Sequence, residues 1–122
     1  MKKYLFSGII IAAAIGGGVW WKNTHPSKPN PLDPFAQCLA EKGVTMYGTD
    51  SCSYCQKEKK EFEGAFKYVS YVECRRDPKK CLSMGIEKYP TWIFSDGRRL
   101  AGVQGIDKLA QESGCALPPS EN

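Results

Sequence analysis

Two cysteines three positions apart, Cys52 and Cys55, are the residues of this sequence whose type and spacing best suit chemistry. Such a pair can be half of a metal site, a structural disulfide or a redox-active dithiol. A zinc site usually needs a second ligand pair, and the remaining cysteines are spaced differently. The single histidine, His25, lies in a proline-rich stretch, so neither a metal site nor a Cys–His catalytic pair is predicted.

A strand that leads into a helix would position this pair for disulfide exchange. Residues 44–48 form a β-branched and aromatic run suited to a buried strand, and a polar turn leads into a helix predicted from about Cys52 to Phe66. The Cys52 sulfur would then meet unpaired backbone N–H groups and the positive end of the helix dipole, which favours the thiolate. Cys55, one turn later, is placed to resolve a mixed disulfide. The pattern therefore favours a redox-active dithiol over a zinc site or a purely structural disulfide.

The predicted helix has an apolar face and a charged face. The apolar face carries Cys55, Phe62, Ala65 and Phe66. We expect the lysines of this helix, together with Glu58 and Glu61, to face solvent, and we assign them no catalytic role.

The remaining elements follow in the order α-β-α-β-α-β-β-α. A first helix is predicted from Asp33, as its cap, to just before Gly43, and the last helix spans 105–114. Further strands are predicted at 68–74, 91–95 and 98–102, with a short helix ending at Gly85. Strands separated by helices predict parallel pairing, and the hairpin at Asp96-Gly97 adds one antiparallel strand. The predicted fold class is α/β.

The N-terminal segment predicts a membrane anchor. Residues 4–21 carry no charge, and in a helix they would extend about 27 Å, enough to cross a bilayer core. The lysines in residues 1–3 favour a cytoplasmic N-terminus. A cleaved signal peptide is the alternative, since residues 12–14 offer a cleavage site. Both interpretations place the rest of the chain outside the cytoplasm.

The rest of the chain divides into a proline-rich linker (22–32), one domain (33–115) and a C-terminal tail (116–122). In the domain, 13 lysine and arginine residues oppose 12 acidic residues, a net charge of +1. This balance gives no indication of a nucleic-acid partner. The densest basic cluster, residues 75–80, is interpreted as a solvated loop.

Six cysteines in so small a domain are typical of an oxidising compartment. They permit about fifteen complete pairings, and the residues alone do not choose among them.

Tyr89-Pro90-Thr91, immediately before a predicted strand, completes a wider pattern. With the C-x-x-C at a helix start, it makes the sequence resemble the thioredoxin-like superfamily, whose members carry a cis-proline beside the cysteine pair. The runs MYGTDSCSYCQKEKKEF, YVEC, GIEKYPTWIF and GRRLAGVQGIDKLA, in this order, are most similar to the thioredoxin-like domain linked to bacterial vitamin K epoxide reductase homologues. The resemblance covers about residues 35–114 and implies a thioredoxin-like fold, a mixed sheet flanked by helices.

The resemblance implies roles for several of these residues. Cys52 would be the exposed nucleophile and Cys55 its buried partner, with Tyr89, Pro90 and Thr91 as the substrate-binding segment. It also implies a second pair, Cys74–Cys81, which we interpret as a structural disulfide, with electron relay as the alternative. Cys38 and Cys115 lie outside the matched pattern and are expected to pair with each other.

The implied function is that of a thiol–disulfide oxidoreductase without a cofactor, anchored in the cell membrane by one span, its domain on the periplasmic or extracytoplasmic side. Its partners would be exported proteins with cysteines and a quinone-linked, vitamin K epoxide reductase-like membrane enzyme that reoxidises it. The alternatives are a reductase or isomerase of the same compartment and a non-catalytic binding module stapled by disulfides. Met46 and Ser51 replace a buried acid and an aromatic residue of thioredoxins, which suits a compartment-specific partner.

Overall fold

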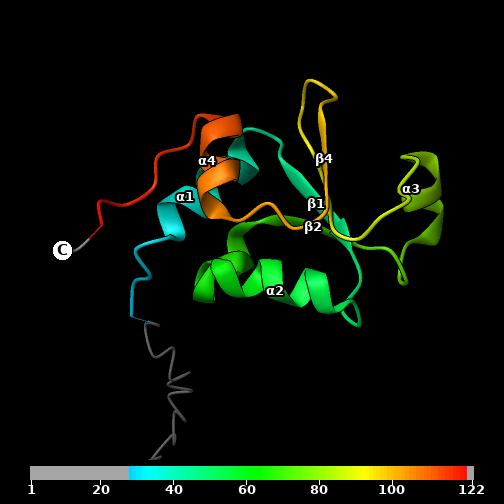
Figure 1. The fold of residues 1–122 in the computed structure, drawn as a ribbon, viewed down its shortest axis with the longest axis horizontal. Helices are drawn as coiled ribbons and strands as arrows, with labels where there is room; N and C mark the ends of the chain where they lie inside the picture. The colour runs from blue at the N-terminus through cyan, green and yellow to red at the C-terminus, as the bar shows by residue number, and fades with distance from the viewer. Residues whose placement is uncertain (1–27, 121–122) are drawn as a thin grey trace, which may run out of the picture.

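The computed structural model describes residues 28–120, which follow the predicted order of elements with one added 3₁₀ helix (Figure 1). The elements are α1 (Asp33–Glu41), β1 (Thr45–Gly48), α2 (Ser53–Glu61), the 3₁₀ helix η1 (Glu63–Tyr68), β2 (Ser70–Glu73), α3 (Pro78–Ser83), β3 (Thr91–Ile93), β4 (Arg99–Ala101) and α4 (Ile106–Ser113). The predicted anchor, residues 4–21, lies outside the described residues. Within residues 28–120, no helix is both long and apolar enough to span a membrane.

The helix that follows the cysteine pair is shorter than predicted. α2 ends at Glu61, and the chain continues as η1 instead of reaching Phe66 as one α-helix. The break coincides with Glu63, whose φ of +53° lies outside the right-handed helical region. Phe62 and Ala65 are nevertheless fully buried, and Phe66 packs against the same core, so the predicted inward face is confirmed.

The first helix begins differently from the prediction. Leu32, not Asp33, is the cap residue, and the Asp33 carboxylate accepts a hydrogen bond from the Asn30 N–H at 3.2 Å. Leu32 is buried in the core although it falls in the predicted linker. At the other end, Leu117 of the predicted tail packs against that core. Contacts of the domain thus continue on both sides of residues 33–115.

The sheet has the strand order β2-β1-β3-β4. β1 and β2 are parallel, and β3 and β4 form the predicted antiparallel hairpin. The prediction of parallel pairing is wrong for β3, which runs antiparallel to β1. A parallel strand would need a connection that returns the chain along the whole sheet. Here the six-residue α3 stays at the end of the sheet where β2 finishes, and β3 starts from that same end (Figure 1).

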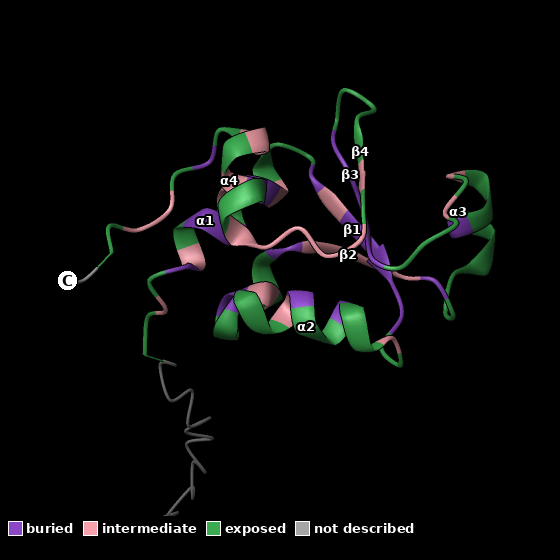
Figure 2. Ribbon diagram, in the orientation of Figure 1, coloured by how far each residue is buried: buried purple, intermediate pink, exposed green. Residues whose placement is uncertain are grey.

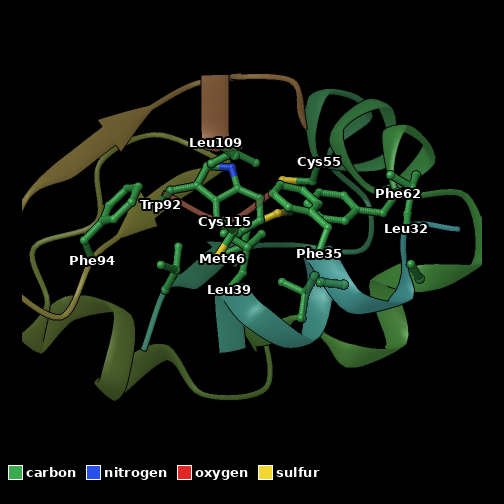
Figure 3. Packing of buried hydrophobic residues seen from close by; sticks show 14 residues of the cluster. Leu32, Phe35, Leu39, Met46, Cys55, Phe62, Trp92, Phe94, Leu109 and Cys115 are labelled. Atoms are coloured by element: carbon green, nitrogen blue, oxygen red, sulfur yellow. The ribbon is translucent and has the colours of Figure 1, made fainter. Parts of the chain in front are cut away.

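The core lies on one face of the sheet, under α1, α2 and α4 (Figures 2 and 3). Met46 of β1 and Trp92 of β3 are register partners that project into it, because alternate strand residues share a face. Phe35 and Phe62 stack there with their ring centres 5.8 Å apart. Cys55 is part of this packing, so the core itself fixes one of the two candidate redox cysteines (Figure 3).

Two disulfides brace the domain, and they join the pairs expected from the sequence. Cys38 of α1 is bonded to Cys115, just after α4, with a Cα–Cα distance of 5.9 Å. Cys74, just after β2, is bonded to Cys81 of α3, with a Cα–Cα distance of 5.6 Å. The second bond holds α3 against a smaller apolar cluster that includes Tyr47 and Ile93. Cys52 and Cys55 are left as free thiols.

Candidate active site

Cys52 occupies the cap position of α2, directly after the turn that leaves β1. Its backbone is extended (φ −79°, ψ 120°), and its N–H donates to the Thr49 carbonyl at 3.2 Å. The Cys52 sulfur in turn accepts a hydrogen bond from the Cys55 N–H at 3.3 Å. The sulfur therefore takes the place that a serine or aspartate oxygen takes in an ordinary helix cap. A negative charge on this sulfur would be stabilised by the first N–H groups and the dipole of the helix.

Cys55 differs from Cys52 in accessibility. Its side chain is fully buried, whereas Cys52 is only partly covered. Burial raises the pKa of the Cys55 thiol to about 12, and its contacts with Cys52 add to this rise. An exposed sulfur at a helix start and a buried, protonated sulfur one turn later give the pair an unequal division of roles. Cys52 is the sulfur that an incoming thiol or disulfide can reach.

The segment Tyr89-Pro90-Thr91 lies beside Cys52, although 37 positions separate Tyr89 from it. The Cys52 thiol points at the Tyr89 carbonyl oxygen, with a distance of 3.7 Å between sulfur and oxygen. The Tyr89–Pro90 peptide bond is cis, and Pro90 is buried. Thr91 is also buried, and its hydroxyl donates to the Lys88 carbonyl at 2.6 Å. The Thr91 side chain thus holds the loop in place, and its part in substrate binding stays a prediction.

A mostly apolar groove of about 410 Å³ opens next to this segment. It is lined by Tyr54 of α2, by Lys88 and Tyr89, and by Gly102 and Val103 after β4. Tyr54 is 65% exposed and Tyr89 is 40% exposed, so two accessible aromatic side chains line the groove. The groove can receive an apolar side chain of a polypeptide whose cysteine approaches Cys52.

Charged groups surround the turn on the other side of Cys52. Arg75 donates to the Ser51 hydroxyl at 3.3 Å, and Arg76 lies 3.8 Å from the Asp50 carboxylate. A second hollow of about 330 Å³ is lined by Asp50, Glu73, Arg75 and Arg76. All basic residues in 75–80 are exposed, as predicted, but Lys79 and Lys80 lie in α3 and not in a loop. Within residues 28–120, no three or more histidine, cysteine or acidic side chains gather in a way that could hold a metal ion.

Glu58 is the residue of this region that sequence reasoning missed. Instead of facing solvent, its carboxylate is fully buried and accepts hydrogen bonds from the N–H groups of Gln104 (2.7 Å) and Gly105 (2.9 Å). Burial raises the pKa of this carboxyl, while the two backbone donors oppose the rise. Glu58 lies three residues after Cys55 and four before Phe62, and this helical spacing was the available signal for an inward position. It joins α2 to the loop that forms one wall of the apolar groove.

The comparisons with known proteins agree with this arrangement. No family model matches the chain. The chain is similar to a protein named thiol-disulfide oxidoreductase LTO1 from Arabidopsis thaliana, with 36% identity over 97 residues that cover 69% of this chain and 26% of the relative. The chain therefore spans about a quarter of the length of that protein. The mixed sheet with its flanking helices and the named relative both fit a thioredoxin-like fold.

Proposed function

We propose that this chain is a thiol–disulfide oxidoreductase that works through Cys52 and Cys55. One observation carries the proposal: the free, accessible Cys52 sulfur caps α2, bonds to the Cys55 N–H and points at the Tyr89 carbonyl. The relative's name, which describes this chemistry, is a second support. A purely structural pair would have no need of an accessible sulfur beside an open groove.

The exchange divides into two steps. In the reducing direction, the Cys52 thiolate attacks one sulfur of a substrate disulfide, and the other substrate sulfur leaves as a thiolate. Cys55 then loses its proton and attacks Cys52, which breaks the mixed disulfide and releases the second substrate thiolate. The enzyme is oxidised by two electrons and the substrate is reduced by two. In the oxidising direction the same steps run backwards, with Cys55 as the leaving thiolate.

The substrate approach follows from the groove and the Tyr89 backbone. An extended polypeptide that lies along Tyr89-Pro90-Thr91 would bring its own cysteine to Cys52. Tyr54, Tyr89 and Val103 would contact an apolar residue next to that cysteine. We therefore propose substrates that present cysteines in exposed or unfolded segments.

We further propose that the chain oxidises exported proteins and is itself reoxidised by a vitamin K epoxide reductase-like membrane enzyme. The sequence resemblance and the six cysteines support this direction, and so does the uncharged segment 4–21. A membrane anchor would place the domain on the extracytoplasmic side and raise its local concentration near a membrane partner. Operation as a reductase or isomerase uses the same two sulfurs.

Trapping of mixed disulfides tests the proposed function. The full-length Cys55→Ser variant, expressed in its host, should accumulate disulfides between Cys52 and its partners, since the resolving thiol is gone. Mass spectrometry of the trapped species should identify exported cysteine-containing proteins and a quinone-linked membrane enzyme. The Cys52→Ser/Cys55→Ser variant is the control and should trap none. Equal recovery from both variants, or none from either, would count against disulfide exchange.

The reduction potential decides the direction. A value of about −120 to −180 mV would fit an oxidant, and one near about −270 mV would fit a reductant. Equilibration of the purified chain with glutathione buffers gives this value.

A further inference from the structure

Lys59 is set apart from the other lysines of α2 by its surroundings. Lys57 and Lys60 are exposed, whereas Lys59 is partly buried. Its ammonium group lies 3.9 Å from the centre of the Tyr71 ring and 5.4 Å from the centre of the Phe66 ring. Two aromatic rings therefore hold this charge in place on the side of α2 that faces β2.

A carboxylate completes the surroundings of the Lys59 ammonium. Asp50 Oδ1 lies 3.0 Å from Lys59 Nζ and also accepts a hydrogen bond from the Tyr71 hydroxyl at 3.4 Å. The Asp50 backbone is held as well: its carbonyl accepts from the Gln56 side chain at 2.8 Å, and its N–H donates to Glu73 at 3.3 Å. Lys59 is thus tied to the turn that delivers the nucleophilic cysteine.

Cys55 lies one helical turn before Lys59, and residues four apart on an α-helix are neighbours. Burial raises the pKa of Cys55 to about 12, and two effects act against that rise: a hydrogen bond with the Thr49 backbone and, to a smaller extent, the positive charge of Lys59. Tyr71 is close enough that a charge on Cys55 contributes, after burial and Asp50, to a raised pKa of its hydroxyl. Lys59 is therefore a held cation one helical turn from the sulfur that must ionise, and its charge acts on that sulfur.

The other groups around Cys55 do not offer such a charge. Cys52 makes ionisation of Cys55 harder. β1 and β3 contribute Met46, Gly48 and Trp92 on this face, none of which is charged. Glu58, on the same inward face of α2, is a carboxylate that accepts hydrogen bonds from the Gln104 and Gly105 N–H groups and offers no positive charge.

We propose that Lys59 is a positioning residue for disulfide exchange, whose fixed charge stabilises the thiolate of Cys55. The inference rests on the proposed function and adds a residue to it. When Cys55 resolves a mixed disulfide, its proton passes to solvent, the Cys52–Cys55 bond forms and the substrate sulfur leaves as a thiolate. When the enzyme disulfide is attacked instead, Cys55 is the thiolate that leaves. Lys59 stabilises Cys55 in both directions, so the inference does not depend on whether the chain oxidises or reduces.

Stopped-flow reaction of the reduced full-length chain with 5,5′-dithiobis(2-nitrobenzoate) separates the two steps. Cys52 releases a first thionitrobenzoate when it forms the mixed disulfide, and the attack of Cys55 releases a second. We expect Lys59→Met to slow the second release about tenfold at neutral pH and to move its pH profile upwards by about one unit, with little change in the first. Lys59→Arg should restore both, because it keeps the charge.

Two further variants exclude a merely structural effect. Lys60→Met removes an exposed charge from the same helix and should leave both releases unchanged. Lys59→Gln keeps a polar group near Asp50 without the charge. It should show the same slowed second release and the same shifted pH profile, so it supplies the test if Lys59→Met folds poorly. An unchanged second release in the charge-free variants, or a slowing without any shift in pH profile, would overturn the role of Lys59. A wild-type chain that shows no second release would instead overturn the proposed function itself.

Discussion

The sulfur of Cys55 lies against the backbone of Gly48: a Cβ atom added at Gly48 would stand 2.6 Å from Cys55 Sγ. Real Cβ atoms do not come this close to other heavy atoms, so any side chain at position 48 must displace the thiol. The absence of a side chain at the end of β1 is therefore what makes room for the Cys55 thiol.

Gly48→Ala should accordingly affect both stability and exchange. We expect the free energy of unfolding to fall by about 1–3 kcal/mol, because the core around Cys55 is overpacked. The release that depends on Cys55 should also slow. Urea denaturation and the stopped-flow assay measure the two effects. Gly64→Ala is the matched control, since a Cβ there would meet only the Asn30 side chain at 3.6 Å. Equal behaviour of the two variants would contradict the steric argument.

Glu58 should make stability depend on pH in an unusual direction for a carboxylate. Burial raises the pKa of Glu58 in the folded chain above the ordinary 4.5. At a pH between 4.5 and this raised pKa, the unfolded chain has released a proton that the folded chain still keeps. The contribution of Glu58 to stability is thus complete below about pH 4.5 and is lost as the pH rises through the folded pKa. Denaturation across this range should show that loss in the wild type and not in Glu58→Gln.

The Glu58→Gln variant should also be less stable overall, by about 1–3 kcal/mol, because a side-chain amide cannot accept from both the Gln104 and Gly105 N–H groups. Glu61→Gln, an exposed change on the same helix, serves as the control. If both variants follow the wild-type pH profile, Glu58 does not titrate as proposed.

The two free thiols should differ strongly toward alkylation. At neutral pH, iodoacetamide should modify Cys52 and spare Cys55, which is fully buried and whose pKa burial raises to about 12. The reactive species is the thiolate, so in a Cys52→Ser variant the labelling of Cys55 should rise about tenfold per pH unit. Mass spectrometry gives the extent at each pH. In urea, where Cys55 is exposed, its labelling should match that of an ordinary thiol; equally fast labelling in the folded chain would be the contrary result.

The two disulfides should contribute unequally to stability. They join residues separated by 77 and by 7 positions. In the chain-entropy account, the longer loop stabilises by about 4.5 kcal/mol and the shorter by about 2.5 kcal/mol. The Cys38→Ser/Cys115→Ser variant should therefore lose more free energy of unfolding than Cys74→Ser/Cys81→Ser.

The exchange assay distinguishes a structural role of the Cys74–Cys81 disulfide from a role in electron relay. If this disulfide is only structural, Cys74→Ser/Cys81→Ser should keep the rates of both thionitrobenzoate releases at a temperature where it is folded. It should also still be reoxidised by the membrane enzyme that we propose as its partner. Loss of reoxidation with intact stability would instead assign it to electron relay.

Local signals explain what could be predicted from the sequence. The order of elements, the hairpin at Asp96-Gly97 and the position of Cys52 at a helix start depend on turn chemistry and short-range periodicity, and the structure confirms them. The cysteine pair was recognisable for the same reason, since its spacing and its strand-to-helix setting are both local.

The features that were missed depend on contacts between distant segments. β3 is antiparallel to β1 because α3 stays at one end of the sheet, which no residue in β3 signals. Glu58 is buried because backbone N–H groups 46 and 47 positions later receive its carboxylate. Within a run of lysines and glutamates, composition favoured an exposed position. The surroundings of Lys59 could not be predicted either, because Asp50 and Tyr71 approach its ammonium group only in the folded chain.

The bond between Cys38 and Cys115 has a mechanical consequence. Because it joins α1 to the segment just after α4, tension applied between residue 28 and residue 120 passes through this bond and not through the sheet. The 77 positions between the two cysteines would release roughly 250 Å of extended chain if the bond were reduced, and none while it is intact. While the Cys38–Cys115 bond is intact, force applied to the two ends is therefore carried past the segment that contains Cys52 and Cys55.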